Sequence, residues 1–323
     1  AQTHGVTLDV VTGFLYPGHA VARMHAPPSR TGGELHAALA NAASAAGADC
    51  VHNATVTTLF ANQDRRIAGV EFVRPDGSVE RLGCEQLILA CNGYGGNVEM
   101  VKEHIPEMAE AQYFGHPGNQ GEAVLWGRAL GGVAACMSAY QGHGSVASPH
   151  QILITWALMM EGGIQINMQG ERFSNEHDGY SEQSVRVLAQ PGQIAWCVFD
   201  ERLHALGQTF DDYRGAVAQG ALKRANTVEE LAMALSVPVD ALMRSIEQTN
   251  AQALCPFGRD FSKTAALEAP FHAIRVTGAL FHTQGGLMID THARVVDARG
   301  QALPNLYAGG GAACGVSGKQ VSG

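Results

Sequence analysis

Residues 85–97 read EQLILACNGYGGN, a continuous apolar run that leads directly into a glycine turn. A run of this kind is typical of a strand buried in a parallel sheet. A helix-like segment follows the turn. A strand, a glycine turn and a helix N-terminus together present backbone N–H groups and the positive end of a helix dipole. These residues therefore predict an α/β domain with a turn that suits a phosphate group.

The residues on either side continue this pattern of strands, glycine turns and helices. Alanine and leucine recur at helical spacing over 32–48, which predicts a helix buried through small residues, and 54–61 predicts a strand. Residues 66–91 predict further strands, two of which form a hairpin across the PDG turn at 75–77. A glycine loop leading into a helix is predicted at 117–132.

The middle third of the chain has a different character. A capping box, with Thr227 as N-cap and Glu230 at N3, predicts the start of a helix over 226–235. A second amphipathic helix is predicted at 239–252. The strand and glycine-turn pattern then returns in the last part of the chain. We therefore predict a strand-and-glycine-turn fold interrupted by an inserted, mostly helical domain over 143–262.

The last part, 285–311, predicts a strand, a tight turn and a second strand, and it ends in the bare stretch LYAGGGAACG at 306–315. This stretch has four glycines, three alanines and no charge. Glycine lets a backbone approach something else closely. Either two chain segments cross tightly here, or a ligand lies against the peptide N–H groups.

Composition limits the class of protein. The chain has 323 residues, with 46% hydrophobic and 16% charged residues, so it suits about two globular domains of roughly 150 residues each. The net charge of −9 argues against nucleic acid as a partner. No apolar run reaches the ~18 residues of a membrane span, and no signal peptide is visible. Seven cysteines without a C-x-x-C motif predict buried free thiols in a reducing, cytoplasmic compartment: Cys50, Cys84, Cys91, Cys136, Cys197, Cys255 and Cys314.

Four motifs make the chain resemble the flavoproteins related to fumarate reductase and succinate dehydrogenase. LILACNGYGGN at 87–97 is similar to that family's LATGGFGGN, and GERFSNE at 170–176 is similar to GxRFxNE. FHTQGGLMID at 281–290 resembles HHTxGGxxID, and PNLYAGGG at 304–311 resembles PGLYAAGE. The motifs follow in the family's order, and the resemblance covers nearly the whole chain.

The resemblance implies the domain organisation. In this family an FAD-binding domain is interrupted by a mobile capping domain, and the active site lies between the two. The implied fold class is α/β with an α+β cap, in which an incomplete Rossmann-like FAD-binding domain is interrupted by a mostly helical capping domain. Residues 1–142 and 263–323 would form the FAD-binding domain and 143–262 the cap, hinged near 140–143 and 262–266.

The resemblance also implies non-covalently bound FAD. The implied cofactor-binding residues are Val56, Ala90, Gly93, Gly95, Gly96, Gly121, Gly285, Gly310 and Gly311. Two departures weaken this expectation. The G-x-G-x-x-G fingerprint is absent, and the family would place it before residue 1. Gly311 stands where PGLYAAGE has its acidic residue. We expect the complete protein to bind FAD, and this chain alone to bind it poorly or not at all.

Three residues are candidates for catalysis. Tyr180 lies four residues after Glu176, where fumarate reductases have a proton-donating arginine, and ketosteroid dehydrogenases of the same superfamily use a tyrosine nearby. A phenol can serve as general acid or base if its pKa is lowered from about 10. The resemblance of QGHGS to QxHPT and of FHTQGG to HHTxGG implies that His143 and His282 bind a substrate oxygen. Each of the three could instead be a structural residue.

Other positions depart from a strict fumarate reductase. The substrate-clamping arginine of the family falls at Val321, and the glutamate and arginine of its proton path fall at Trp156 and Met159. A bidentate clamp on a carboxylate is therefore lost, and the pocket is expected to be more apolar.

Four charged residues remain to be interpreted. Arg172 and Glu176 favour a structural ion pair. Arg186 and Arg202 are spare cations that could hold a carboxylate.

The sequence thus predicts an FAD-dependent oxidoreductase that transfers hydride between flavin and an activated carbon–carbon bond, by enoyl-type reduction or the reverse dehydrogenation. Its partner would be a small molecule with a double bond or CH–CH bond next to a carbonyl, and not fumarate. The absence of a C-x-x-C-H motif leaves the electron partner open. The alternative is a truncated or degenerate flavoprotein fragment without activity, which acts as a binding or assembly module.

Overall fold

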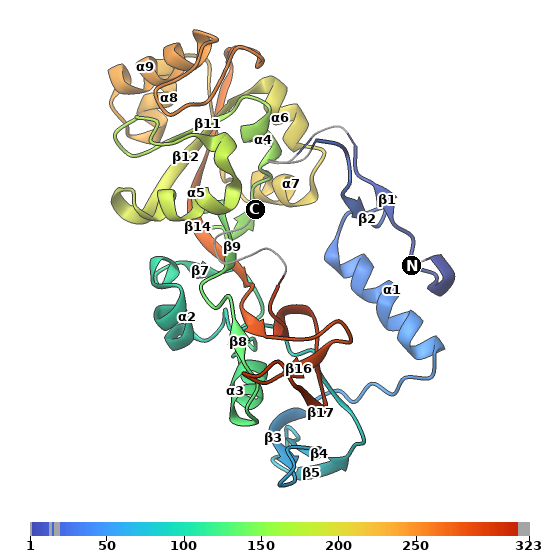
Figure 1. The fold of residues 1–323 in the computed structure, drawn as a ribbon. Coiled ribbons are helices and arrows are strands. Elements are labelled where there is room, and N and C mark those ends of the chain that lie inside the picture. Colours follow the sequence, from blue (N-terminus) through green and yellow to red (C-terminus); the bar gives the residue numbers. More distant parts are fainter. Residues whose placement is uncertain (1, 13–14, 16–19, 316–323) are drawn as a thin grey trace. The chain divides into compact units, whose positions relative to one another are not determined.

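Figure 1 shows the fold in a computed structural model of the chain, which describes residues 2–12, 15 and 20–315. The chain folds into two compact units. The first comprises Ala1–Ala61 and Ala68–Cys84, and the second comprises Asn62–Ile67 and Glu85–Gly323. All three catalytic candidates lie in the second unit.

The N-terminal part of the chain contains short strands and one long helix. Its elements are η1 (Gln2–His4), β1 (Asp9–Val10), β2 (His25–Ala26), α1 (Gly32–Ala45), β3 (Thr55–Ala61), β4 (Ile67–Val73) and β5 (Val79–Gly83). The hairpin predicted across the PDG turn is confirmed, because β4 and β5 pair antiparallel with Val73 opposite Val79. The predicted helix is confirmed as α1, whose N-cap Thr31 accepts a hydrogen bond from the backbone N–H of Glu34. The predicted burial is wrong, because no residue of α1 is buried.

A glycine-rich region surrounds the stretch 85–97 in the second unit. Its elements are β6 (Leu87–Leu89), α2 (Val98–His104), η2 (Pro106–Met108), β7 (Gln112–Tyr113), α3 (Glu122–Ala129), β8 (Ala134–Ala135), β15 (Gly286–Leu287), β16 (Arg294–Val296), β17 (Ala302–Ala308) and η5 (Gly310–Ala312). β17 lies parallel to β6, and Leu306 is opposite Leu87. The predicted parallel strand is therefore confirmed, but Ile88 is 68% exposed, so β6 is covered on one side only.

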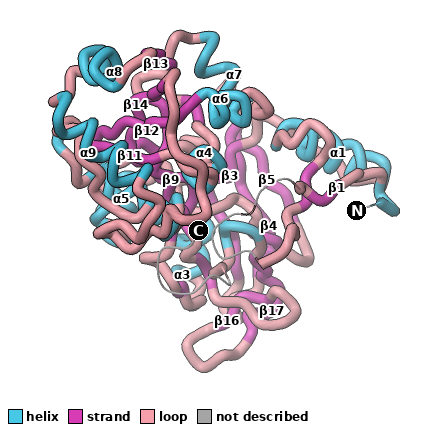
Figure 2. Tube along the Cα trace, turned by 90° about the horizontal axis from the view of Figure 1, so that it is seen from above, coloured by secondary structure: helices cyan, strands magenta, loops and turns pink. Residues whose placement is uncertain are grey.

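The rest of the second unit is built on a larger sheet. Its elements are β9 (Tyr140–Ala147), β10 (Ile152–Leu153), α4 (Ala157–Met160), β11 (Ile164–Ile166), η3 (Glu176–Asp178), α5 (Tyr180–Leu188), η4 (Pro191–Gln193), β12 (Ile194–Asp200), α6 (Glu201–Gly207), α7 (Asp211–Ala218), β13 (Leu222–Ala225), α8 (Val228–Leu235), α9 (Val239–Asn250) and β14 (Phe271–Thr283). The strand order is β10-β9-β14-β12-β11, and β13 and β7 also pair with β14. In Figure 2 these strands lie among the helices α4 to α9.

The inserted segment 143–262 thus contains the predicted helices and also strands of an antiparallel sheet, none of which the sequence analysis assigned individually. Both predicted helices of this segment are confirmed as α8 and α9, and the Thr227 hydroxyl caps α8 by accepting from the backbone N–H of Glu230. Strand β14 contributes to the same sheet although it begins at Phe271, beyond the predicted end of the insertion. The domain borders at 142/143 and 262/263 stay a prediction.

Two further expectations concern the described residues as a whole. No helix among residues 2–12, 15 and 20–315 is long and apolar enough to cross a membrane. All seven cysteines are free thiols, as predicted, but only Cys197 and Cys255 are buried. Their general burial was inferred from apolar neighbours in sequence, and that inference is wrong because sequence neighbours need not be neighbours in space.

Candidate active site

Two of the predicted catalytic residues are in contact. His143 lies on β9, and Tyr180 is the first residue of α5. Their rings stack with centroids 4.9 Å apart and planes 18° apart. The other face of the cluster is aromatic as well, because Phe281 of β14 stacks on His143 at 5.3 Å and Trp156 meets it edge-on at 5.7 Å. His143 is therefore enclosed by rings.

Glycines allow α5 to lie close enough to the sheet for this stacking. A β-carbon on Gly144 would come within 2.8 Å of the backbone of Gln183, and one on Gly142 would overlap the Ser184 side chain. A β-carbon on Gly278 of β14 would overlap the backbone oxygen of Ser184. The Ser181 hydroxyl also accepts a hydrogen bond from the backbone N–H of Gly142, at 2.8 Å. The glycines of QGHGS thus set the position of Tyr180.

The Tyr180 hydroxyl has a polar partner that sequence reasoning missed. The Gln141 side-chain amide donates a hydrogen bond to this oxygen at 2.8 Å. Burial raises the pKa of Tyr180 above its usual value, and the bond from Gln141 opposes this only in part. The sequence prediction required a lowered pKa, and the direction is the opposite because the ring is mostly withdrawn from water. Tyr180 is therefore a protonated phenol at neutral pH.

A signal for Gln141 was present in the sequence. Gln141 precedes His143 by two positions in QGHGS, and residues two apart on a strand point to the same face. A strand assignment for QGHGS would have placed both on the face that meets α5.

His143 itself is neutral. Burial lowers the pKa of His143 to about 3, and its Nδ1 has no hydrogen-bond partner among the described residues. A neutral imidazole with an unpaired, buried nitrogen can donate to or accept from a ligand without a change of charge. His143 is thus suited to holding an oxygen atom and unsuited to acting as a cation near pH 7.

His282 is exposed and lies beside the Tyr180 partner. It is the Cα partner of Gln141 in the antiparallel pair β14–β9. Directly opposite residues point to the same face of a sheet, so His282 and Gln141 are neighbours. The three predicted catalytic residues therefore gather at one place, where the start of α5 meets the strands β9 and β14.

Most of the predicted cofactor-binding glycines are packed against the chain itself. A β-carbon on Gly93 would overlap the Thr283 hydroxyl, and one on Gly95 would overlap the Tyr113 ring. Close contacts of this kind also surround Gly96, Gly121, Gly285 and Gly311. Packing alone accounts for a glycine at these six positions.

Gly309 and Gly310 behave differently from their neighbour Gly311. A β-carbon on either would meet no atom of the described residues within 4 Å, whereas one on Gly311 would overlap the Asn92 side chain. Gly310 also has φ = 58°, which favours glycine. Close packing of chain segments therefore accounts for Gly311, and the approach of a ligand at Gly309 and Gly310 stays a prediction.

The two remaining candidates for cofactor binding, Ala90 and Val56, are not glycines. Ala90 is exposed just after β6. Val56 is half-buried in β3 of the first unit.

Two of the positions at which the chain departs from fumarate reductases carry buried apolar residues, and the cations expected to be spare have partners in the chain. Trp156 and Met159 are each 1% exposed. Val321 lies outside the described residues. The two cations predicted to be spare already have partners, because Arg186 pairs with Asp178 at 2.8 Å and Arg202 donates to the backbone oxygen of Glu161 at 3.1 Å.

The predicted pairing of Arg172 with Glu176 is confirmed. The Arg172 Nη2 lies 2.6 Å from Glu176 Oε2, with both side chains 1% exposed. Arg259 adds a second guanidinium to the same carboxylate at 2.9 Å.

Comparisons with known proteins agree with this arrangement. The family model described as FAD binding domain matches residues 11–321. The chain belongs to this FAD-binding domain family.

The relatives are named as reductases, oxidoreductases and a dehydrogenase. A probable fumarate reductase of Shewanella frigidimarina is 29% identical over 93% of this chain and 52% of its own length. An NADH:fumarate oxidoreductase of Klebsiella pneumoniae is 28% identical over 97% of this chain and 34% of its own length. The chain therefore spans about half or a third of the length of these relatives.

The fold is shared with solved structures. The open conformation of a flavocytochrome c3 fumarate reductase matches with a TM-score of 0.80 and 28% identity, over 98% of this chain and 56% of the other. A 3-ketosteroid Δ1-dehydrogenase from Sterolibacterium denitrificans matches with a TM-score of 0.68 at 24% identity, over 87% of this chain and 58% of that structure. The predicted α/β fold class and family are confirmed.

Proposed function

We propose that the chain is the catalytic part of an FAD-dependent oxidoreductase that reduces a carbon–carbon double bond next to a carbonyl group. The family membership supports FAD as the cofactor. The relatives' names include fumarate, acrylate and urocanate as compounds acted upon, and each of these contains such a double bond. The observation that carries the proposal is the position of Tyr180. Its hydroxyl accepts a hydrogen bond from Gln141, and its ring stacks on the neutral His143.

The backbone around Gly309 and Gly310 fits a flat cofactor edge. Open space in front of both residues leaves room for a ligand, since no side chain of the described chain fills it. The N-terminal turn of α3, capped by Gly121 with φ = 86°, offers N–H groups for a phosphate. FAD, when bound, supplies the hydride. The other glycines that the resemblance implied would act by letting the chain pack behind this surface.

Tyr180 would supply the proton. The reduction of an activated double bond needs one hydride and one proton, delivered to neighbouring carbons. A phenol whose pKa is raised keeps its proton at neutral pH, so Tyr180 is in the protonated form that a proton donor needs. The hydrogen bond from Gln141 then stabilises the phenolate oxygen that remains.

His143 and His282 would hold the carbonyl oxygen of the substrate. Negative charge develops on this oxygen as hydride arrives at the far carbon, so a hydrogen-bond donor there stabilises the transition state. The buried and unpaired Nδ1 of His143 is one suitable atom. His282 stands opposite Gln141 and is exposed, so it can be reached from outside.

The substrate would be less charged than fumarate. The rings of Trp156 and Phe281 surround His143, and Met159 is buried nearby in sequence. A second carboxylate would meet apolar side chains here and remain unpaired, which is unfavourable. An enone or an enoate with an apolar substituent suits these surroundings better.

The cap, the location and the electron partner are also part of the proposal. Residues 143–262 would act as the cap over the cofactor, and its closure would exclude water from the site. The location would be the cytoplasm. The electron partner would be a diffusible molecule or another chain.

A spectrum of the complete protein tests this function against the inactive alternative. After incubation with FAD and removal of free cofactor, the protein is expected to show flavin absorbance. After anaerobic reduction, an enone or enoate is expected to restore the oxidised spectrum. A colourless protein without affinity for added FAD would support the inactive binding or assembly module instead.

A further inference from the structure

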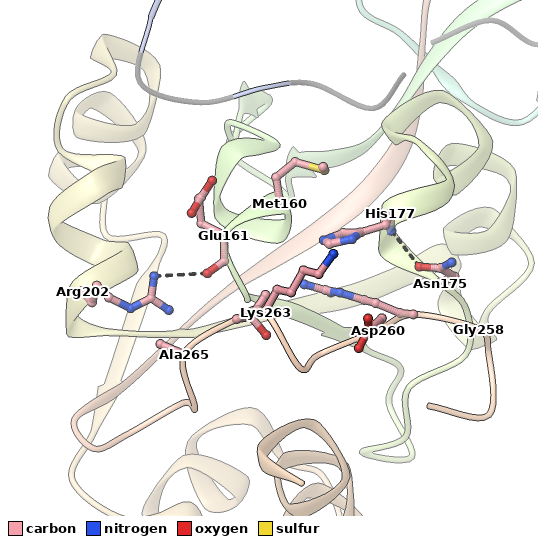
Figure 3. Close-up of a pocket in the computed structure, with 11 residues that line it drawn as sticks. Met160, Glu161, Asn175, His177, Arg202, Gly258, Asp260, Lys263 and Ala265 are labelled. Carbon is pink, nitrogen blue, oxygen red and sulfur yellow. Dashed lines mark hydrogen bonds between the residues drawn. The ribbon is translucent and has the colours of Figure 1, made fainter. Parts of the chain in front are cut away.

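We propose that a cavity of about 690 Å³ in the second unit binds a small carboxylate. Figure 3 shows this cavity, which is formed by the end of α4, the turn η3, the helix α6 and the loop 258–265. Its volume lies within the usual range for small-molecule pockets, roughly 300–1,000 Å³. None of Tyr180, His143 and His282 lines it. The site is therefore separate from the proposed reaction and does not depend on it.

Positively charged and N–H-bearing side chains line the cavity from several elements. Arg202 comes from α6, His177 from η3, and Arg259 and Lys263 from the loop. In Figure 3 the amino end of Lys263 points towards the His177 ring. No salt bridge to Lys263 exists within the part of the chain that the structure describes. Cations that gather in this way favour an anion between them.

Behind the cavity wall lies an excess of buried positive charge. Arg172 and Arg259 both pair with the single carboxylate of Glu176, at 2.6 and 2.9 Å. All three side chains are at most 1% exposed. Two guanidinium groups on one carboxylate leave one positive charge uncompensated, and an uncompensated buried charge is costly.

The two arginines of this cluster, Arg172 and Arg259, have different surroundings. The Cys255 sulfur lies beside Arg172, and the guanidinium helps to lower the pKa of that thiol although burial acts to raise it. Arg259 is one of the residues that form the cavity wall, with its guanidinium buried behind it, so an anion in the cavity would lie on the Arg259 side of the cluster.

Two buried nitrogen atoms of the cavity residues also lack hydrogen bonds. Arg259 Nε and His177 Nε2 are shielded from water without a partner among the described residues. The backbone oxygens of Met159 and Met160 lie near the His177 ring and favour its protonated form, but they make no hydrogen bond of normal geometry with Nε2. Buried donors are nearly always paired in native proteins. The two unpaired nitrogen atoms therefore add to the hydrogen-bond-donating character of the cavity wall.

A carboxylate fits the charge of this cavity better than a phosphate does. The acidic side chains of Glu161 and Asp260 also line it, so the net positive charge is small. A singly charged group balances the excess on the cluster of Arg172, Glu176 and Arg259. A phosphate group, which carries nearly two charges at neutral pH, would be repelled by the two carboxylates. Asn175 and Thr264 add neutral partners for the second oxygen atom.

The pKa of His177 is expected to change when an anion binds in the cavity. Burial lowers the pKa of His177, and the charge of Arg259 lowers it further. An anion placed between them favours the imidazolium form and raises this pKa. The effect is local, because it depends on the distance between the anion and the ring.

The test is a proton NMR titration of the His177 ring in the full chain, assigned by comparison with His177→Gln. Sodium acetate and sodium propionate are the probes, and ionic strength is held constant with sodium chloride. We expect the pKa of His177 to rise in a saturable manner with either carboxylate. Lys263→Ala is expected to weaken the apparent affinity about tenfold, as for one lost charge-assisted hydrogen bond. Lys223→Ala, which removes another exposed lysine outside the cavity, is expected to change nothing.

Three outcomes would overturn the inference. The first is a pKa of His177 that does not respond to the carboxylates, or responds equally to chloride. The second is an equal affinity in wild-type protein and Lys263→Ala. The third is tighter binding of inorganic phosphate, which would assign the cavity to another class of anion.

Discussion

The imidazole of His143 and the phenol of Tyr180 stack at a centroid distance of 4.9 Å, although 37 residues separate them in the chain. This contact joins a strand to the first turn of a helix, and it holds a neutral ring against a protonated phenol. Because both groups are uncharged near pH 7, the pair can deliver a proton and stabilise an oxygen atom without burying a net charge before the reaction.

Removal of the Tyr180 hydroxyl should abolish most of the activity. Tyr180→Phe keeps the stacking ring and removes the proton that the proposed reaction needs. General acid catalysis typically contributes ~10²–10⁴-fold, so the rate of flavin reoxidation by substrate is expected to fall by about that factor. Stopped-flow absorbance measures this rate. Tyr213→Phe, which removes a buried hydroxyl bonded to His204 elsewhere in the unit, serves as the control and should keep the wild-type rate. Wild-type turnover in Tyr180→Phe would end the assignment.

The hydrogen bond from Gln141 should be visible in the pH dependence of the reaction. The pKa of Tyr180 is already raised by burial, and Gln141 lowers it again in part. A general acid must be protonated, so the rate should fall as pH rises through this pKa. In Gln141→Leu the opposing effect is lost, the pKa rises further, and the fall in rate should move to higher pH. A pH–rate profile of the single-turnover reaction measures the shift; an unchanged or lowered midpoint would contradict the role of Gln141.

Gly309 offers a sharper test of cofactor approach than Gly310. Gly309 has φ = −153°, which valine adopts readily, and a β-carbon there meets no atom within 4 Å in the part of the chain that the structure describes. Gly309→Val should therefore fold normally and lose FAD through a clash with the cofactor alone. Fluorescence titration with FAD and thermal unfolding measure the two properties.

The matched comparison is Gly311→Val, in which the new side chain overlaps Asn92 and should lower stability directly. Full FAD affinity in a stable Gly309→Val protein would show that the open space is not part of the cofactor site.

The buried carboxylate of Glu176 should dominate stability at low pH. Burial acts to raise the pKa of Glu176, but the charges of Arg259 and Arg172 outweigh it, so the folded-state pKa lies below the ordinary 4.5. The stabilisation is thus present above the unfolded pKa and is lost as pH falls through the folded value. Glu176→Gln should lower the free energy of unfolding at pH 7 by about 3–5 kcal/mol.

Urea denaturation at several pH values measures this change, and the difference between the two proteins should shrink in acid. Glu99→Gln, which removes an exposed carboxylate paired with Lys102, should change stability by less than about 1 kcal/mol. A loss in Glu176→Gln that stays constant from pH 7 down to acid would contradict the assignment of its charge.

Local signals explain what the sequence predicted well. Helix α8 follows from Thr227 and the periodic residues after it, and the β4–β5 hairpin follows from the PDG turn, because a cap or a turn is set by residues a few positions apart. The clustering of Tyr180, His143 and His282 came from the motif resemblance, since nothing local links residues on α5, β9 and β14.

Burial and packing explain what the sequence did not predict. The pKa of Tyr180 has the opposite direction to the one expected, because burial is a property of the folded chain. Gly310 and Gly311 are adjacent and identical, yet only one is packed against Asn92, and no sequence pattern distinguishes them. The central strand β14 takes its partners from β7, β9, β12 and β13, so its place in the sheet could not be read from 271–283 alone.

The length of β14 has a mechanical consequence for any closing motion. Its first seven residues, 271–277, are the partners of Ile194–Asp200 in β12, whereas its last residues pair with β7 and with the start of β9. A rotation of 143–262 about 262–266 would break the backbone hydrogen bonds between β12 and β14. A rotation that preserves them must carry the first half of β14 along and flex the strand beyond Thr277, where the first of its two register shifts with β9 lies, between Thr277 and Ala279. The pivot would then fall at Gly278, which packs against the helix that begins with Tyr180. Opening and closing would therefore move Tyr180 together with the first half of β14.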